Sequence, residues 1–315
     1  MSPSRLPGLR GRAGTTLKRG MRRLFPGRSG PGPDVGHTPA VPPQPEAEAP
    51  PQVANPNPPE AGILTEEMLR LNGEAASAEG VVAAVHPQDF IYWFICRHPN
   101  LTLPAATSYY FSDGASSARK LDEIVSELGY PADGPVKLLE FASGYGCVTR
   151  HLKQNPRWDL TSCDIHREAI EFLEGPIGVR TLQSTSQPEQ FAAPVAYDIV
   201  FALSFFSHMP RSSFGRWLKA LYSTLKSPGY LIFTTHGVKS SVAFGITPED
   251  IPADGFLFRA NSEQDDLDTV EYGSTLSTPQ FVIQELFRSV GAPIARFREA
   301  AWWGHQDLWV VKKVD

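Results

Sequence analysis

The second half of the chain alternates between short apolar runs and amphipathic segments, and this alternation restricts the possible fold more than any other feature. The apolar runs predict β-strands, because they are short and rich in β-branched and aromatic residues. The predicted strands lie at residues 136–141, 159–163, 179–184, 198–204 and 230–235. The predicted helices lie at residues 147–154, 167–174, 214–225 and 279–290. Strands that alternate with helices of this length imply βαβ units and a parallel sheet covered on both faces.

Two further predicted strands, residues 295–301 and 308–311, close the chain with no crossover helix between them. They should form a hairpin, which places one antiparallel strand in an otherwise parallel sheet. The predicted fold class is therefore α/β. We expect a doubly wound, mostly parallel, Rossmann-like sheet of seven strands that ends in an antiparallel hairpin.

Composition divides the chain into three regions. Residues 1–60 are predicted to be a disordered tail, basic and then rich in proline, because they have too few large apolar side chains to offset the entropy of ordering. Residues 61–135 are predicted to be a helical cap. Its helical patterns lie at residues 65–71, 87–97 and 118–128. Residues 136–315 contain the alternating pattern, with a long insertion at 237–277.

Charge is distributed unevenly along the chain. Residues 1–34 contain eight Lys and Arg residues and one Asp, a formal charge of +7; because the whole chain carries −5, residues 35–315 carry −12. We therefore expect no nucleic-acid partner for the folded part, since Lys and Arg provide most of the non-specific affinity for phosphates. The basic tail is interpreted as a solvated arm, with contact to a membrane surface or RNA as the alternative.

Other classes of protein are disfavoured by what the sequence lacks. No apolar run approaches the roughly 20 residues that cross a bilayer, so we expect no transmembrane segment. The three cysteines have no paired metal-ligand spacing, and we expect neither a metal site nor a disulfide framework. These features favour a reducing, cytoplasmic compartment. The oligomeric state is left open.

A glycine-rich segment follows the first predicted strand, from Glu140 to Cys147. Gly144 and Gly146 allow the backbone to bend tightly and to approach a ligand closely. The helix that begins after this turn presents free backbone N–H groups, which suit a carboxylate. The segment is thus a candidate for binding a small ligand that carries a carboxylate.

Here the sequence resembles the class I S-adenosylmethionine-dependent methyltransferases, and residues 136–236 follow the family pattern. The resemblance implies S-adenosyl-L-methionine as the cofactor, with Glu140 near the amino group of its methionine moiety. It places Ala142, Gly144 and Gly146 at three small-residue positions, where Ala142 departs from the usual glycine. Ser143 and Tyr145 belong to the same predicted site. These residues are Glu140, Ala142, Ser143, Gly144, Tyr145 and Gly146.

Asp164 follows the second predicted strand, about 18 residues beyond Gly146, where a carboxylate can accept both ribose hydroxyl hydrogens. The alternative role for Asp164 is a helix cap ahead of residues 167–174. The resemblance implies ribose binding by Asp164 and packing of Ile165 against adenine. Ser184, at the end of the third predicted strand, is a further candidate cofactor contact.

The fourth predicted strand ends at Leu203 and Ser204, and the carboxyl ends of parallel strands are where ligands bind. Both residues are predicted to contact the cofactor. The segment at residues 225–229, Leu-Lys-Ser-Pro-Gly, resembles the turn that leads into the fifth strand of the family. Nearby, His208 and His236 are candidate general bases, since neutral imidazole accepts a proton near physiological pH. For both, a structural role in a loop is the alternative.

Two further parts of the chain are candidates for the site. Residues 109–114 precede the predicted helix at 118–128, and the resemblance implies an aromatic ring from this segment near the cofactor sulfonium. Tyr110 is the predicted contact, with Gly114 beside it and Tyr109 as the alternative. The insertion is predicted to recognise the substrate, with Glu263 and Tyr272 as candidate contacts.

The predicted function is transfer of a methyl group from S-adenosyl-L-methionine to an oxygen or nitrogen acceptor. The expected acceptor is a small molecule such as a sugar or a secondary metabolite. A protein or peptide methyltransferase is the alternative within this class. A catalytically silent interaction domain is disfavoured by the intact glycine turn, and an NAD-binding oxidoreductase by Thr149, which occupies the third glycine position of the dinucleotide motif.

Overall fold

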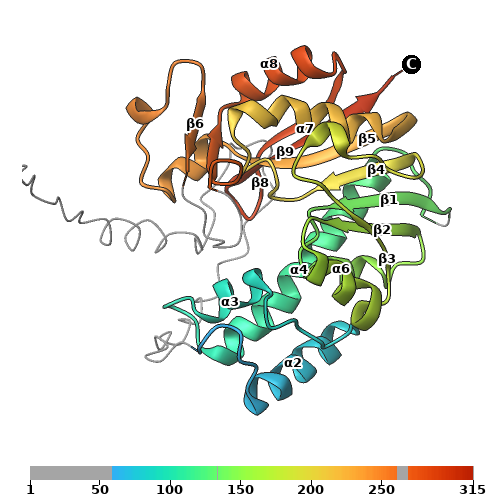
Figure 1. The fold of residues 1–315 in the computed structure, drawn as a ribbon, viewed down its shortest axis with the longest axis vertical. Coiled ribbons are helices and arrows are strands. Elements are labelled where there is room, and N and C mark those ends of the chain that lie inside the picture. Colours follow the sequence, from blue (N-terminus) through green and yellow to red (C-terminus); the bar gives the residue numbers. More distant parts are fainter. Residues whose placement is uncertain (1–58, 133, 261–268, 315) are drawn as a thin grey trace, which may run out of the picture.

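The computed structural model describes residues 59–132, 134–260 and 269–314. All but the last two residues of the predicted tail, and also Glu263, lie outside these ranges. The described residues form a sheet of seven strands in the order β3-β2-β1-β4-β5-β9-β8 (Figure 1). The five strands β1 to β5 are parallel, and β9 is antiparallel to both β5 and β8. The predicted fold class, including the antiparallel hairpin, is confirmed.

The strands begin and end within a few residues of their predicted limits, apart from β5. They are β1 Val136–Phe141, β2 Trp158–Asp164, β3 Arg180–Gln183, β4 Tyr197–Ala202, β5 Leu225–His236, β8 Ile294–Trp302 and β9 Gln306–Lys313. Residues 225–229, which we predicted to be a turn, form the beginning of β5. The pairing of β5 with β4 is irregular there, with a register shift between Tyr197 and Ile199.

Helices cover both faces of the sheet. They are α2 Glu66–Glu79, α3 Phe90–Cys96, α4 Leu103–Glu127, α5 Thr149–Leu152, α6 Arg167–Phe172, α7 Arg211–Ser223 and α8 Pro279–Ser289. Figure 1 shows α7 and α8 on one side of the sheet and α4 and α6 on the other. Successive strand residues point to opposite faces, so Phe141 packs with α7 and α8 whereas Leu138 packs with α4.

Helix α4 differs most from its prediction. It runs for 25 residues from a Thr102 cap, so residues 109–114, predicted to precede a helix, lie within it. Its first half shares a buried cluster with α2 and α3, through Tyr110 and Phe111. Its second half packs on the sheet through Leu121. One continuous helix therefore joins the N-terminal helices to the main sheet.

The insertion between β5 and α8 contains a second, two-stranded sheet. Its strands are β6 Phe256–Arg259 and β7 Ser274–Ser277. Just before and within β7, the chain contacts the segment that follows β4, where Gly273 N donates to His208 O at 3.0 Å and Thr275 N donates to Ser207 O at 2.8 Å. The insertion is thus attached beside the carboxyl end of β4. Within the described ranges, no helix has the length and apolar character needed to span a membrane.

Candidate functional site

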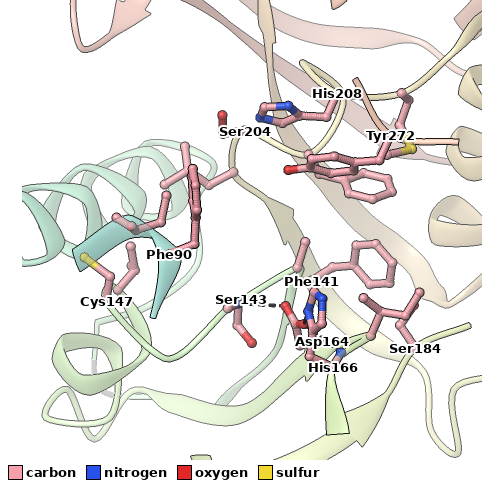
Figure 2. A pocket seen from close by; sticks show the side chains of 18 of the residues that line it. Phe90, Phe141, Ser143, Cys147, Asp164, His166, Ser184, Ser204, His208 and Tyr272 are labelled. Atoms are coloured by element: carbon pink, nitrogen blue, oxygen red, sulfur yellow. Dashed lines mark hydrogen bonds and ion pairs between the residues drawn. The ribbon is translucent and has the colours of Figure 1, made fainter. Parts of the chain in front are cut away.

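A cavity of about 1160 Å³ opens where the parallel strands end, between the sheet, α3 and the insertion (Figure 2). Most of the predicted site residues line it. They are Glu140, Ala142, Ser143, Gly144, Tyr145, Asp164, Ile165, Ser184, Leu203, Ser204, His208, His236 and Tyr272. Three predicted residues, Tyr110, Gly114 and Gly146, do not line it. The carboxyl ends of the five parallel strands therefore bring most of the predicted residues together, as parallel topology requires.

The two glycines of the turn after β1 have different surroundings. Gly144 has φ +54°, and a Cβ placed on it would meet no atom within 4 Å, so the space beside it is open. Gly146 has φ +82°, but its Cβ would lie 2.9 Å from Leu173 Cδ2. Gly144 thus leaves room for a ligand, whereas Gly146 allows the turn to pack on the protein. Both adopt the left-handed backbone conformation that glycine tolerates at no steric cost.

Left-handed backbone also occurs at non-glycine residues around the cavity. Ala142, Ser204 and Trp303 have φ values of 57°, 56° and 51°, and all three line it. Such conformations cost about 1–3 kcal/mol each and cluster at functional sites. At Ala142, the position where the resemblance implies a glycine, the backbone adopts the conformation that glycine favours.

Asp164, the last residue of β2, closes the turn after β1. Its Oδ2 accepts from Gly144 N at 2.8 Å, and its Oδ1 accepts from His166 N at 3.0 Å. Asp164 is 6% exposed and lines the cavity. Asp164 thus orients the glycine turn and the start of α6 at once. Oδ1 also lies 2.9 Å from His166 Nδ1, so Oδ2 is the oxygen that keeps a second lone pair for a ligand hydroxyl.

Glu140 lies behind the same turn. Its Oε2 accepts from Thr149 Oγ1 at 2.7 Å and from Ser162 Oγ at 2.9 Å. Burial raises the pKa of Glu140 to about 7, and the neighbouring Asp164 adds to this effect, while the two hydroxyl donors oppose it. The carboxyl group therefore titrates near neutral pH, unlike an exposed glutamate.

This raised pKa predicts how the stability of the protein without ligand depends on pH. The folded state holds the Glu140 proton more tightly than the unfolded state, so the stabilisation is present at low pH and is lost as pH rises through about 7. Between pH 5.5 and 8.5 this loss amounts to about 2 kcal/mol. We expect Glu140→Gln to remove that part of the pH dependence in denaturant titrations. An identical pH profile in the variant would contradict the assignment.

Tyr110 lies in the core instead of the cavity, because residues 109–114 are helical and its ring points between the helices. Its hydroxyl donates to Asp89 Oδ2 at 2.6 Å and accepts from Arg150 Nη2 at 3.2 Å. Tyr109, the alternative, lines the cavity. Gly114 supports the site indirectly, since a Cβ there would lie 2.2 Å from Cys147 O. Helix α4 can therefore pack directly on the glycine turn.

Arg150 was not found by sequence reasoning, yet it connects the N-terminal helices to the turn. It is fully buried and donates through Nε to Gly146 O at 2.9 Å. Its Nη1 donates to Val82 O at 2.8 Å and to Ala84 O at 2.9 Å. An exposed arginine on a short surface helix would have the same sequence pattern. The sequence therefore gives no sign that Arg150 is buried.

The two candidate bases differ in whether Nε2 of the imidazole already has a hydrogen-bond partner. His208 Nδ1 lies 2.8 Å from Gly273 O, and because a carbonyl only accepts, the proton is on Nδ1 and Nε2 carries the lone pair. Burial lowers the pKa of His208 to about 4, and the pKa of His236 also lies well below its ordinary value because of burial. Both imidazoles are therefore neutral at pH 7.

His236 is oriented by Gln306 of β9. Thr234 Oγ1 accepts a hydrogen bond from Ser204 N at 2.8 Å. The Thr234 hydroxyl therefore donates its proton to Gln306 Oε1, at 2.6 Å. This bond determines which end of the Gln306 amide is the oxygen. The amide nitrogen at the other end donates to His236 Nε2 at 3.1 Å. His236 Nε2 is thus occupied as an acceptor, and the proton of this imidazole is on Nδ1.

One side of the cavity is formed by a connected set of rings that we call the aromatic wall. Its members are Tyr272, His208, His236, Phe244, His305 and Trp303. The Tyr272 and His208 rings stack at 4.6 Å with 7° between their planes, and Figure 2 shows this pair on the side of the cavity opposite Asp164 and Ser184. His236 lies 6.2 Å from His208 and 4.8 Å from Phe244, measured between ring centroids.

The aromatic wall continues into the turn between β8 and β9. The centroid of His305 lies 5.7 Å from that of His236 and 6.1 Å from that of Trp303. Trp303 Nε1 donates to Asp113 Oδ1 at 2.6 Å, which fixes the indole against α4. Within the described ranges, no group of three or more His, Cys, Asp or Glu is arranged to hold a metal ion.

The strand order, the antiparallel β9 and the cavity at the strand ends define the class I methyltransferase fold. Residues 139–231 match the model of a family described as a methyltransferase domain. The matched part runs from β1 into β5 and includes the glycine turn. The comparison with curated proteins found no match.

Several solved structures of methyltransferases are similar. One is 1,6-didemethyltoxoflavin-N1-methyltransferase from Burkholderia thailandensis, with 13% identity over 64% of this chain and 79% of that chain, at a TM-score of 0.45. Another is the glycopeptide N-methyltransferase MtfA with sinefungin, with 16% identity, 64% and 87% coverage and a TM-score of 0.47. A third is magnesium protoporphyrin IX methyltransferase from Synechocystis PCC 6803, with 13% identity, 66% and 87% coverage and a TM-score of 0.45.

Proposed function

We propose that this protein transfers a methyl group from S-adenosyl-L-methionine to an oxygen or nitrogen atom of a small molecule. The observation that supports this best is the turn after β1 of a methyltransferase domain. There Gly144 leaves open space beside the backbone, and its N–H is held by Asp164. A cofactor with a carboxylate, an ammonium group and a ribose fits the donors and acceptors of this turn.

The proposed cofactor contacts follow from the position of each residue in the cavity. Glu140 binds the amino group of the methionine moiety, and Asp164 accepts from the ribose hydroxyls. Ile165 is 37% exposed beside Asp164 and provides an apolar surface for the adenine ring. Ser184 N donates to Asp164 O at 2.7 Å, which holds the end of β3 beside the same ribose. Leu203 and Ser204 border the methionine side.

When bound, the cofactor supplies a methyl group already activated by its sulfonium. The protein then has to position the acceptor atom in line with that methyl group and exclude water. His208 is suited to the acceptor, because its Nε2 lone pair can receive a hydrogen bond from a hydroxyl or amine. His236 Nε2 already accepts from Gln306, so of the two candidate bases the geometry favours His208.

Calorimetric titration of the full chain tests this function. We expect S-adenosylmethionine and S-adenosylhomocysteine to bind one site per chain, and NADH not to bind. Binding of NADH alone would favour the oxidoreductase, and binding of none of the three would contradict the proposed function. Cofactor binding without methyl transfer to any member of a set of hydroxyl and amine acceptors would favour the silent interaction domain.

Asp164→Ala provides a specific test of the ribose contact. We expect the dissociation constant for S-adenosylmethionine to rise about 10- to 100-fold, which corresponds to about 1–3 kcal/mol for lost hydrogen bonds to buried polar groups. Asp159→Ala is the matched control, because Asp159 lies on the same strand but pairs with Arg180 outside the cavity. If the two variants bind equally well, Asp164 only orients the turn into α6.

A further inference from the structure

The charged side chains that line the cavity in the described part of the chain are already paired. Arg216 is the one Lys or Arg among the described lining residues, and its guanidinium binds both carboxylate oxygens of Glu189. The part of the insertion outside the described ranges, residues 261–268, contains no Lys or Arg in its sequence. An anionic acceptor would therefore lose its hydration without gaining a free cation from the described lining, which is strongly unfavourable.

The acidic residues of the cavity likewise have partners. Asp113 accepts from Trp303 Nε1, and Asp89 accepts from Tyr110 Oη at 2.6 Å. Glu271 at the rim accepts from Gln187 Nε2 at 3.3 Å. Glu140 and Asp164 belong to the proposed cofactor contacts. The aromatic wall itself carries no charge at pH 7, because burial also lowers the pKa of His305.

The shape of the lining favours a flat ligand. The aromatic wall presents six aromatic side chains. The Tyr272 and His208 rings lie parallel and stacked, so a planar ligand can extend this stack on an exposed ring face. Phe90 and Phe94 of α3 stack at 6.0 Å, and Figure 2 shows Phe90 across the open part of the cavity from the His208–Tyr272 pair. Aromatic ligands gain from such surfaces through offset stacking and edge contacts, beyond the area they bury.

We propose that the methyl acceptor is an uncharged, planar aromatic molecule bearing a hydroxyl or N–H group, bound between the aromatic wall and Phe90. This inference rests on the proposed function, since it assigns the cofactor to the opposite end of the cavity. His208 Nε2 receives the hydrogen bond from the acceptor hydroxyl or N–H. The ring of the acceptor packs against Phe244, Tyr272 and Trp303.

Three probes of similar size separate planarity from charge. They are 2-naphthol, which is flat and neutral, decahydro-2-naphthol, which is saturated, and 6-hydroxy-2-naphthoate, which is anionic. Their dissociation constants are measured with the full chain at pH 7, with and without S-adenosylhomocysteine. We expect 2-naphthol to bind at least tenfold more tightly than either analogue. Equal or tighter binding of an analogue, or no binding of 2-naphthol up to its solubility, overturns the inference.

Variants locate the binding. We expect Tyr272→Leu and Phe244→Leu each to raise the dissociation constant for 2-naphthol at least fivefold. The affinity for S-adenosylhomocysteine should not change. Phe287→Leu is the matched control, because Phe287 is 79% exposed on α8 and does not line the cavity. An equal effect of all three variants on 2-naphthol would contradict binding at the aromatic wall.

The two proposals fail in different ways. If S-adenosylhomocysteine binds and 2-naphthol shows no preference over its analogues, the aromatic acceptor is wrong and the proposed function stands. If 2-naphthol binds with the expected preference but neither S-adenosylmethionine nor S-adenosylhomocysteine binds, the proposed function is wrong. The aromatic wall is then a ligand site of another activity.

Discussion

Gly144→Val is expected to abolish binding of S-adenosylmethionine, with a loss of at least 100-fold in affinity measured by calorimetry. A β-branched side chain would extend into the open space beside the turn, which we assign to the methionine moiety. It would also be held at φ +54°, which costs about 1–3 kcal/mol for such a residue. We therefore expect a lower free energy of unfolding as well.

Gly80→Val separates these two effects. Gly80 has φ +68° at the end of α2, its Cβ would meet no atom within 4 Å, and it does not line the cavity. This variant should lose similar stability in denaturant titrations while keeping full cofactor affinity. Wild-type affinity in folded Gly144→Val would show that the turn after β1 does not bind the cofactor.

Arg150→Met is expected to lower the free energy of unfolding by about 3–5 kcal/mol, the usual result of breaking a buried charged network by removing one partner. The substitution keeps apolar volume but leaves Val82 O and Ala84 O without their donor, and Gly146 O keeps only the 3.3 Å bond from the backbone N–H of residue 150. Since Gly146 belongs to the glycine turn, cofactor affinity should fall with stability. Chemical denaturation followed by tryptophan fluorescence measures the first effect, and calorimetry the second.

Arg70→Met is the control for this prediction. Arg70 forms an exposed ion pair with Glu74 within α2, and such pairs contribute about 0–1 kcal/mol. We expect its removal to change neither stability nor affinity measurably. If Arg150→Met were as mild as Arg70→Met, the N-terminal helices would not depend on this guanidinium for their attachment to the turn.

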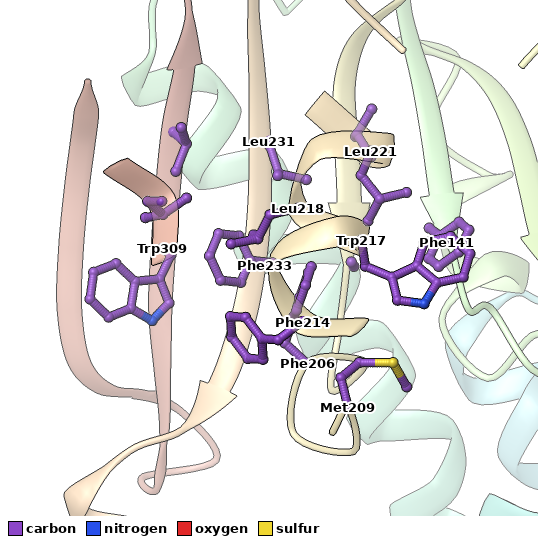
Figure 3. Packing of buried hydrophobic residues seen from close by; sticks show 14 of the residues in the cluster. Phe141, Phe206, Met209, Phe214, Trp217, Leu218, Leu221, Leu231, Phe233 and Trp309 are labelled. Atoms are coloured by element: carbon purple, nitrogen blue, oxygen red, sulfur yellow. The ribbon is translucent and has the colours of Figure 1, made fainter. Parts of the chain in front are cut away.

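The sheet and the helices on it were predictable because their signals are local. Neighbouring residues alone indicate the length of each strand and the helical spacing of apolar residues at 214–225. They also show that no helix connects the last two strands, which predicts the hairpin of β8 and β9. Figure 3 shows the result for α7, where Phe214, Trp217, Leu218 and Leu221 share one cluster with Phe141 of β1. The predicted cofactor residues at strand ends met in one cavity for the same reason, since parallel strands end at one edge.

The errors arose where distant segments decide the structure. Tyr109 and Tyr110 are adjacent in sequence, and only the extension of α4 back to residue 103 determines which of them enters the core. The aromatic wall combines the loop after β4, the end of β5, the insertion and the β8–β9 turn. No spacing in the sequence relates Phe244 to Trp303. Glu263 lies outside the described residues, so its substrate contact stays a prediction.

The insertion and His208 are tied together at a single residue. Gly273, just before β7, donates its N–H to the backbone carbonyl of His208 and accepts the imidazole Nδ1–H of the same residue. The preceding residue, Tyr272, stacks against that imidazole. Under the proposed function, a change in the insertion that alters acceptor binding therefore also displaces the imidazole of His208, and a substitution at either place affects both acceptor affinity and turnover.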